Sequence, residues 1–262
     1  MNRAIGLAAL TVLELPPPEQ VAVAAQAGYS HVGLRLIPVA GQALPSFDPR
    51  ELEHRLADTG IKVLDVEVFR LAPDTRVADF EPVIATAARL GASELLVHGA
   101  DGDAARLAER FGRLCDLAAG YRLNVNLEPM PWVDVCSAGK AKRLLAAVDR
   151  RNAALLVDAI HFFRAGDGFD ELQGVRCNYM QLCDAPAERP SDLQEILRQA
   201  RCDRLFPGDG GLDLRGLMRA LPAGVPISIE IPYAKPMSAL ERAQRALGAT
   251  RKLLHRDAGS WR

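Results

Sequence analysis

Short apolar runs alternate along the chain with longer stretches in which apolar residues recur at helical spacing. The runs with strand character span residues 4–10, 31–37, 62–69, 94–99, 123–128, 154–163, 178–185 and 226–232. The stretches with helical character span residues 17–28, 48–60, 77–91, 103–120, 137–150, 164–174, 191–200 and 237–255, and the sixth of these is short and weak. Eight strand and helix pairs in this order predict an α/β protein with a single (β/α)8 TIM barrel.

Glycines and the lack of linkers refine this prediction. Gly28, Gly60, Gly91 and Gly120 stand at the ends of four predicted helices, where a C-terminal cap favours glycine. Because no linker or low-complexity segment interrupts the pattern, we expect one domain over residues 1–262. An open doubly wound sheet is the alternative. The first strand, however, is not followed by the glycine-rich loop that binds dinucleotides.

Composition limits the class of partner. The chain has 262 residues, is 49% hydrophobic and carries a formal charge of -1, which is typical of a globular protein with a large core. Mixed charges offer no general basic surface for nucleic acid, and no apolar run reaches membrane-spanning length. The N-terminus shows no convincing signal-peptide cleavage site, so a cytoplasmic location is predicted. Five cysteines without a CxxC pair indicate neither a disulfide framework nor a zinc cluster.

Alternation along each strand assigns one set of residues to the barrel interior. On the second and third strands, we expect Val32, Leu34, Leu36, Leu64, Val66 and Val68 to face the helices. The residues expected to face the interior are Gly33, Arg35, Asp65, Glu67, Glu94, His98, Asn124, Asn126, Glu128, Asp158, Gln181, Ser228 and Glu230. Since barrel active sites lie at the carboxyl ends of the strands, this polar set predicts a functional pocket there.

Four of these residues stand at the ends of four consecutive strands: Glu128, Asp158, Gln181 and Glu230. Three converging carboxylates would repel one another, and a divalent cation is the simplest means of keeping them ionised together. Four oxygen donors favour Mn²⁺ or Mg²⁺, with Co²⁺ or Zn²⁺ as alternatives. The competing interpretation is that each residue is an individually hydrogen-bonded polar group of the barrel interior.

The motifs around these residues resemble a known family. Glu128 in NLEP, Asp158 in LLVDAIH, Gln181 in NYMQLCDA and Glu230 in ISIEIP are similar to the corresponding segments of the xylose isomerase-like TIM barrels. This superfamily contains sugar phosphate isomerases and epimerases, inosose dehydratases, hydroxypyruvate isomerases, 3-dehydroshikimate dehydratases and endonuclease IV. The resemblance covers nearly the whole chain. It implies that these four residues hold the metal and that the two glutamates are the acid and base.

Gln181 departs from the family pattern, because most members have histidine there. Bacterial 3-dehydroshikimate dehydratases of the superfamily can carry glutamine at the matching position. Their spacing between the aspartate and a following histidine is also similar to that of Asp158 and His161. His161 is therefore predicted to act as a general acid or base.

The remaining candidates concern the substrate. Three carboxylates and one divalent ion leave a negative balance, so an anionic substrate would require further cations. The residues predicted to bind substrate are Arg35, Glu67, Arg70, His98 and Arg204. For His98, a hydrogen-bonded core role is the alternative. Trp132 is expected either to form a pocket wall or to pack internally, and Asp184 either to orient a ligand or to cap a turn. The loop at 206–213 resembles the PGxG segment of the superfamily and either borders the substrate or is a simple turn.

These observations predict a divalent-metal-dependent isomerase or epimerase of a sugar or related hydroxy-keto compound. It would remove a proton next to a carbonyl, and the metal would stabilise the resulting enediolate. The first alternative is a lyase similar to 3-dehydroshikimate dehydratase, and the second is a non-catalytic barrel that binds metal or ligand. The chain has too few histidines at strand ends for an endonuclease IV-like cluster. The expected partner is a small molecule, not nucleic acid or a membrane, and a homo-oligomer is left open by analogy.

Overall fold

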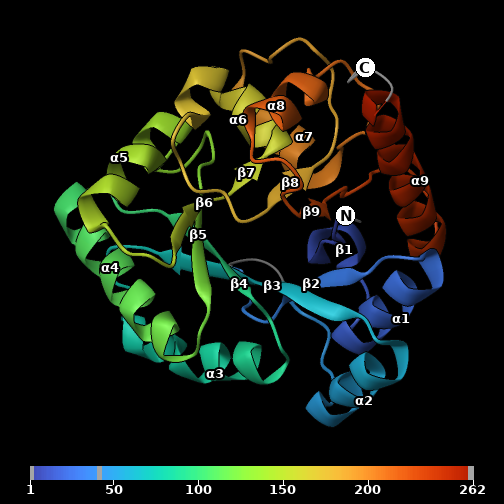
Figure 1. Cartoon of the computed structure of the whole chain (residues 1–262), viewed down its shortest axis with the longest axis horizontal. Helices are drawn as coiled ribbons and strands as arrows, with labels where there is room; N and C mark the ends of the chain where they lie inside the picture. Colours follow the sequence, from blue (N-terminus) through green and yellow to red (C-terminus); the bar gives the residue numbers. More distant parts are fainter. Residues whose placement is uncertain (1–2, 40–42, 259–262) are drawn as a thin grey trace.

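The chain folds into a nearly closed barrel of parallel strands surrounded by helices (Figure 1). The structure, a computed structural model, describes residues 3–39 and 43–258. The strands in this part of the chain are β1 (Ile5–Leu7), β2 (His31–Arg35), β3 (Lys62–Leu71), β4 (Glu94–Gly99), β5 (Asn124–Glu128), β6 (Ala153–Leu155), β7 (Val157–Asp158), β8 (Met180–Leu182) and β9 (Ile227–Ile229). Their order in the sheet is β6-β5-β4-β3-β2-β1-β9-β8-β7.

Two contacts close the barrel. β1 pairs in parallel with β9, so that Gly6 lies opposite Ser228. β6 and β7 are two segments of one extended run, separated by Leu156. β6 pairs with β5 on one side and β7 pairs with β8 on the other. Taken as one strand, β6 and β7 complete the eight-stranded barrel, and the predicted (β/α)8 fold is confirmed.

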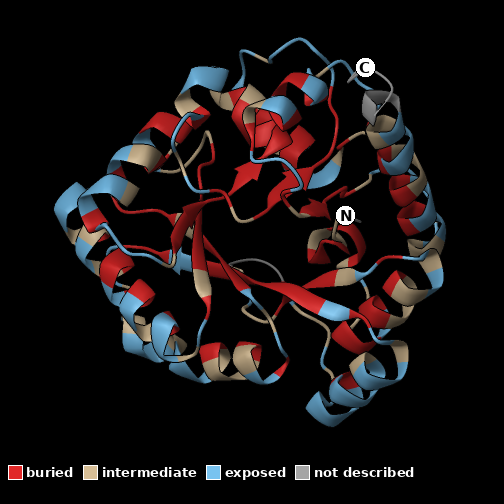
Figure 2. Ribbon diagram, viewed as in Figure 1, coloured by how far each residue is buried: buried red, intermediate tan, exposed pale blue. Residues whose placement is uncertain are grey.

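The helices form an outer layer whose inner faces are buried against the sheet and whose outer faces are exposed (Figure 2). They are α1 (Pro17–Ala27), α2 (Pro49–Thr59), α3 (Glu81–Arg89), α4 (Ala104–Gly120), α5 (Ala138–Val148), α6 (Ala159–Ala165), α7 (Leu193–Cys202), α8 (Leu214–Ala220) and α9 (Ala239–Ala258), with 3-10 helices η1 (Ala9–Val12), η2 (Val77–Phe80) and η3 (Phe169–Leu172). The main apolar core lies between these helices and the strands.

Three of the four predicted glycine caps have the left-handed backbone that favours glycine. Gly28, Gly60 and Gly91 have φ of 89°, 69° and 76° and follow α1, α2 and α3. Gly120 is instead the last residue of α4, and the left-handed position falls on Arg122, with φ of 59°. Helix α4 thus ends at the residue expected from the sequence, but Tyr121 rather than a glycine follows it as the cap.

Several predicted strands extend beyond the observed ones, and at two of them a helix takes the place of the last residues. The expected strand 4–10 ends at Leu7 and continues as η1. The expected strand 154–163 ends at Asp158, whose side chain accepts a hydrogen bond from the backbone N–H of His161 and so caps α6. The apolar residues of α6 cover the barrel as a helix, which a continuous apolar run does not distinguish from a strand. Helix α8, between the loop 206–213 and β9, was not predicted.

Strand β3 does not keep a strict alternation. Its register shifts between Val32 and Gly33 against β2, and between Val66 and Phe69 against β4, and each shift inserts one extra residue into β3. As a result, the prediction that Leu64 and Val68 face the helices was wrong. Both belong to a small apolar cluster inside the barrel, completed by Leu96, Leu156 and Tyr179. Val32, Leu34 and Val66 belong to the main core as expected.

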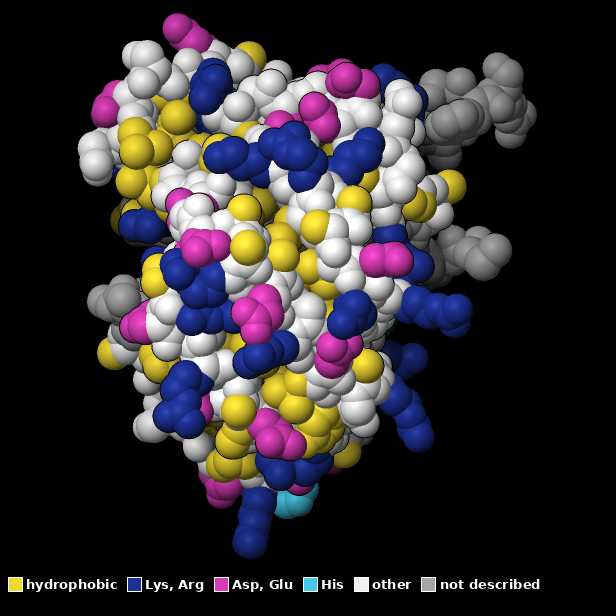
Figure 3. Space-filling view, turned by 90° about the vertical axis from the view of Figure 1, so that its left-hand side faces the viewer, with side chains coloured by type: hydrophobic (Ala, Val, Ile, Leu, Met, Phe, Trp, Pro, Cys, Tyr) yellow, Lys and Arg dark blue, Asp and Glu magenta, His cyan; other side chains and the backbone are white. Residues whose placement is uncertain are grey.

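The molecular surface carries both signs of charge. On the face shown in Figure 3, lysine and arginine side chains are interspersed with aspartate and glutamate. No helix in the described ranges has the length and apolar character needed to cross a membrane.

Candidate active site

A cavity of about 560 Å³ lies at the carboxyl ends of the strands. Arg35 of β2, His98 of β4 and Glu128 of β5 line it from strand ends, and Glu230 lines it directly after β9. The other residues predicted to contact substrate or to take part in catalysis also line the cavity: Glu67, Arg70, His161 and Arg204, together with Trp132. Asp158 and Gln181 are fully buried beside it. The structure therefore brings the predicted set together at one mouth.

Glu128, Asp158 and His161 form a compact buried group. One ligand atom from each lies within 4.8 Å of those of the other two, which is a spacing that can hold a metal ion. Asp158 ends β7 and caps α6, and this cap turns His161, in the first turn of the helix, back toward the barrel. The His161 Nε2 atom lies 3.9 Å from Glu128 Oε1. His161 is thus placed by the same aspartate that the sequence predicts as a metal ligand.

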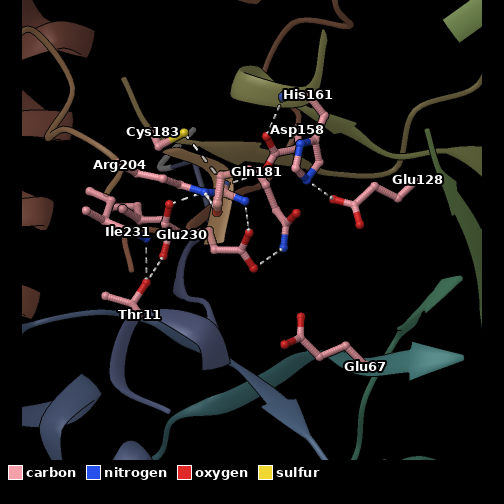
Figure 4. Close-up of polar contacts among 12 residues, drawn as sticks. Thr11, Glu67, Glu128, Asp158, His161, Gln181, Cys183, Arg204, Glu230 and Ile231 are labelled. Atoms are coloured by element: carbon pink, nitrogen blue, oxygen red, sulfur yellow. Dashed lines mark hydrogen bonds and ion pairs between the residues drawn. The ribbon is translucent and has the colours of Figure 1, made fainter. Parts of the chain in front are cut away.

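Gln181 and Glu230 form the other half of the site (Figure 4). The Gln181 side-chain amide donates a hydrogen bond of 3.0 Å to Glu230 Oε1. The Gln181 Oε1 atom is buried and has no hydrogen-bond partner among the described residues. A buried carbonyl oxygen without a donor is costly, and coordination of a cation would satisfy it. The orientation of this amide therefore fits the predicted all-oxygen site.

The backbone around Glu230 is fixed from the neighbouring strands. Thr11, which follows β1, donates its hydroxyl to the carbonyl of Ile229 and accepts from the N–H of Ile231, at 2.8 and 2.9 Å. The Glu230 N–H donates to the Leu182 carbonyl of β8. Together these contacts hold the residues on both sides of Glu230 after β9 has ended.

Arg204 joins the two halves of the site. Arg204 is buried, and its guanidinium donates to Asp158 Oδ2 at 2.6 Å and to Glu230 Oε2 at 2.8 Å (Figure 4). Its Nε atom donates to the Ala200 carbonyl at 2.8 Å. Arg204 lines the cavity as predicted for a substrate-binding residue, but most of its donors are directed at protein carboxylates and a carbonyl. This geometry favours a role in positioning Asp158 and Glu230.

The protein alone does not keep all three carboxylates readily ionised. Burial raises the pKa of Glu128 well above its usual range, and the nearby charge of Asp158 raises it further. Burial also raises the pKa of Glu230 to about 8. Burial alone would raise the pKa of Asp158 too, but Arg204 and His161 outweigh it, and the net direction is downward. A divalent cation would supply the missing positive charge, so the residues present fit one.

Both histidines of the cavity are neutral near pH 7, because burial lowers the pKa of His98 and of His161 to about 3. His98 Nε2 lies 2.6 Å from Glu128 Oε2. Arg35 makes an ion pair of 2.8 Å with Glu67. Two roles were left open for His98, substrate binding and a hydrogen-bonded core position. The structure places His98 in the cavity wall, where its side chain is hydrogen-bonded to Glu128.

One charged residue of the cavity was not predicted from the sequence. Arg201, at the end of α7, lines the cavity, and its guanidinium carbon lies 5.7 Å from the ring centroid of Trp132. The Trp132 ring in turn packs edge-to-face on His161, with centroids 4.9 Å apart. The predicted helix ended at residue 200, and the available signal was the proximity of Arg201 to Arg204 in the sequence.

Asp184 caps a turn and does not line the cavity. It accepts hydrogen bonds from the backbone N–H groups of Ala185, Gly208, Gly210 and Leu212, at 2.8 to 3.2 Å. It thereby fixes the loop 206–213, none of whose residues lines the cavity of 560 Å³. This arrangement matches the simple-turn alternative for that loop.

Known proteins share this fold. The chain is 28% identical over 259 residues to the 3-dehydroshikimate dehydratase of Pseudomonas aeruginosa, an alignment that covers 91% of the chain and 39% of that protein. The chain thus spans about two fifths of the length of this curated relative. A solved IolI protein with a bound zinc atom superposes with a TM-score of 0.79 at 19% identity, covering 97% of this chain and 98% of that one.

A further similar structure is that of a solved 3-epimerase. The D-allulose 3-epimerase of Methylomonas sp. in complex with D-allulose superposes with a TM-score of 0.72 at 17% identity, covering 96% of this chain and 98% of that one. At such identities the solved structures show a common fold alone. Residues 21–253 match the family described as xylose isomerase-like TIM barrel, and this chain belongs to that family.

Proposed function

We propose that this protein is a divalent-metal-dependent dehydratase of a cyclic hydroxy-keto acid of the 3-dehydroshikimate type. The observation that carries the proposal is the convergence of Glu128, Asp158 and His161 within 4.8 Å beside an arginine-lined cavity. The similarity to a 3-dehydroshikimate dehydratase over 91% of the chain favours dehydration over the isomerisation expected first from the sequence.

The residues that would hold the ion are Glu128, Asp158, Gln181 and Glu230, with His161 nearby. A bound divalent ion polarises a substrate carbonyl and stabilises the negative charge that develops on its oxygen. Arg204 keeps Asp158 and Glu230 oriented through ion pairs of 2.6 and 2.8 Å. Because Arg204 is buried with them, its charge acts in a region of low dielectric. The positions of both carboxylates are therefore set before substrate binds.

The proton steps are assigned to His161. A neutral imidazole can accept the proton from the carbon next to the substrate ketone, and the C–H electron pair then forms a new double bond. The C–O bond on the adjacent carbon breaks, and the leaving hydroxyl takes the proton from the imidazolium as water, which restores the neutral imidazole. Transfer of one further proton from a ring carbon to the ketone oxygen gives 3,4-dihydroxybenzoate, so that the product is the substrate less one water. The Trp132 ring against His161 fixes the plane of the imidazole.

Isomerisation or epimerisation is the second candidate, and a specific observation favours it. Glu128 at the end of β5 and Glu230 directly after β9 line the cavity, and these two strands are not neighbours in the sheet. Two such carboxylates can remove a proton from one side of a substrate carbon and return one on the other. In this case the carbon skeleton and the hydroxyl groups would be retained.

The test compares both reactions on protein reloaded with Mn²⁺. With 3-dehydroshikimate, we expect the ultraviolet absorbance of an aromatic acid to appear, and Glu128→Gln should abolish it. Glu94→Gln, which alters a buried glutamate outside the cavity, is the matched control and should retain turnover. Incubation of keto sugars in heavy water, followed by NMR, tests the second candidate.

Incorporation of deuterium into a keto sugar without aromatic product would replace the dehydratase by the epimerase. If wild-type protein retains one equivalent of Mn²⁺ but converts neither class of compound, the non-catalytic binding barrel is favoured instead. In that case Glu128→Gln should lower only the affinity for metal or ligand.

A further inference from the structure

The arginines that line the cavity fall into two kinds. Arg35 is paired with Glu67, and Arg204 is paired with Asp158 and Glu230. Arg70 and Arg201 line the same cavity, but neither has an acidic partner within the described ranges. Two arginines thus serve protein carboxylates, while two present their charge to the cavity.

The charge balance of the site indicates what the two arginines without acidic partners could bind. Three acidic groups line the cavity, Glu67, Glu128 and Glu230, and Asp158 joins them through the ligand cluster and its ion pair with Arg204. Arg35 and Arg204 neutralise two of these charges, and a divalent ion would neutralise the other two. The charges of Arg70 and Arg201 are then in excess, which favours a substrate that carries a negative charge of its own.

Arg201 is the better placed of the two to act on a substrate over His161. Its guanidinium carbon lies 5.7 Å from the centroid of Trp132, and the Trp132 ring contacts His161 edge-to-face. A guanidinium over an aromatic ring is held by a cation–π interaction and keeps its N–H donors free at its edge. These three side chains form one continuous wall of the cavity, with the charge at one end and the imidazole at the other.

We propose that Arg201, held against Trp132, pairs with the carboxylate of the substrate and selects a hydroxy-keto acid over a neutral sugar. A planar guanidinium binds a carboxylate through two parallel hydrogen bonds, so it fixes orientation as well as charge. The proposal rests on the proposed function and names the feature of the substrate that this residue recognises. Arg201 is a specificity residue in this role, whereas His161 and the carboxylates carry the reaction.

Two probes isolate the carboxylate: 3,4-dihydroxybenzoate, and catechol, which is the same ring and diol without the acid group. Isothermal titration of the Mn²⁺-loaded wild type should show that the acid binds at least about tenfold more tightly than catechol, as expected for a charge-assisted hydrogen-bonded pair. In Arg201→Gln this preference should disappear while the affinity for catechol stays unchanged. Arg201→Lys should keep part of the preference, because it retains charge without the planar fork.

Arg198→Gln is the matched control. Arg198 lies one turn earlier on α7, is paired with Glu195 and Asp203, and does not line the cavity. It should keep the wild-type preference. Unchanged catechol binding by each variant also shows that the cavity is still folded.

Three outcomes would overturn the proposal. Wild-type protein could bind both probes equally, Arg201→Gln could keep the full preference, or Arg70→Gln alone could abolish it, which would move the carboxylate to Arg70. The binding ratio is independent of turnover. A protein that prefers the acid through Arg201 but forms no aromatic product from 3-dehydroshikimate would therefore contradict the dehydratase and leave this proposal standing.

Discussion

Strands β4 and β5 carry two buried glutamates in one ladder, and their surroundings differ. Glu94 lies opposite Asn124 near the start of the strands, and His98 lies opposite Glu128 near their ends. Glu94 accepts hydrogen bonds from the side-chain amides of Asn124, Asn126 and Asn178, at 2.8 to 3.1 Å. Glu128 has a histidine on one oxygen and the cavity in front of it.

The comparison separates a structural carboxylate from a candidate ligand. Burial raises the pKa of both groups, so burial and pKa direction do not distinguish them. Their partners do distinguish them. Three neutral amide donors satisfy Glu94 within the protein, and they counteract part of the effect of burial on its pKa. Glu128 faces Asp158 and His161 at ligand spacing and still has space for an ion.

The largest expected effect is on metal binding at the carboxyl ends of the strands. Glu230→Gln removes one of the three carboxylates and should lower the affinity for Mn²⁺ by more than about 100-fold, beyond the range that outer-shell changes reach. The metal content of dialysed, Mn²⁺-reloaded protein should fall from one equivalent to none. Retention of a full equivalent by the folded variant would remove Glu230 from the ligand set. Glu94→Gln, treated identically, should retain its metal.

A smaller but still large effect is expected for Arg204→Met. Removing one partner from a buried ion pair leaves Asp158 and Glu230 without compensation and should cost the metal-free protein about 3–5 kcal/mol of its free energy of unfolding. Addition of Mn²⁺ should recover part of this loss, since the ion replaces the missing positive charge. Denaturant unfolding of both proteins, with and without Mn²⁺, measures the difference. Equal losses in the two conditions would show that Arg204 does not act through the metal site.

The smallest effect is expected at Glu94. Glu94→Gln should change turnover by less than about twofold and the free energy of unfolding by about 1–2 kcal/mol. Its pH dependence is more informative. Because the pKa of Glu94 is raised in the folded protein, its stabilising contribution is present below its ordinary value and is lost as pH rises through the folded value.

The wild type should therefore lose stability relative to the Glu94→Gln variant, whose amide stays neutral, as pH rises above the ordinary pKa of a glutamate. Chemical unfolding at several pH values measures this trend. A difference that is constant over the whole range would show that the amide cluster does not shift the titration of Glu94.

Local pattern predicted much of this architecture, because barrel strands and helices alternate and strand faces repeat every second residue. It correctly placed Arg35, Glu128 and Glu230 at one mouth. It did not foresee the inward positions of Leu64 and Val68, since the two register shifts of β3 depend on its neighbours β2 and β4. A strict alternation of inward and outward residues does not predict where a strand contains an extra residue.

Contacts between residues that are distant in the sequence could not be predicted either. Arg204 lies 46 residues from Asp158 along the chain, and only the closed barrel shows that these two groups form an ion pair. The contrast between Glu94 and Glu128 depends on side chains from several elements, because Asn178 is 84 residues from Glu94. The sequence identified which residues face inward, whereas the fold decides which of them are already satisfied.

The pairing of β1 with β9 has a consequence for how the protein is made. Ile5 lies opposite Ile227, so this contact closes one of the longest loops in the chain and is entropically costly to form early. Synthesis proceeds from the N-terminus, and Glu230 emerges only after β9. A nascent chain that already exposes Glu128 and Asp158 still lacks Glu230, so the proposed metal site is completed only when the barrel closes.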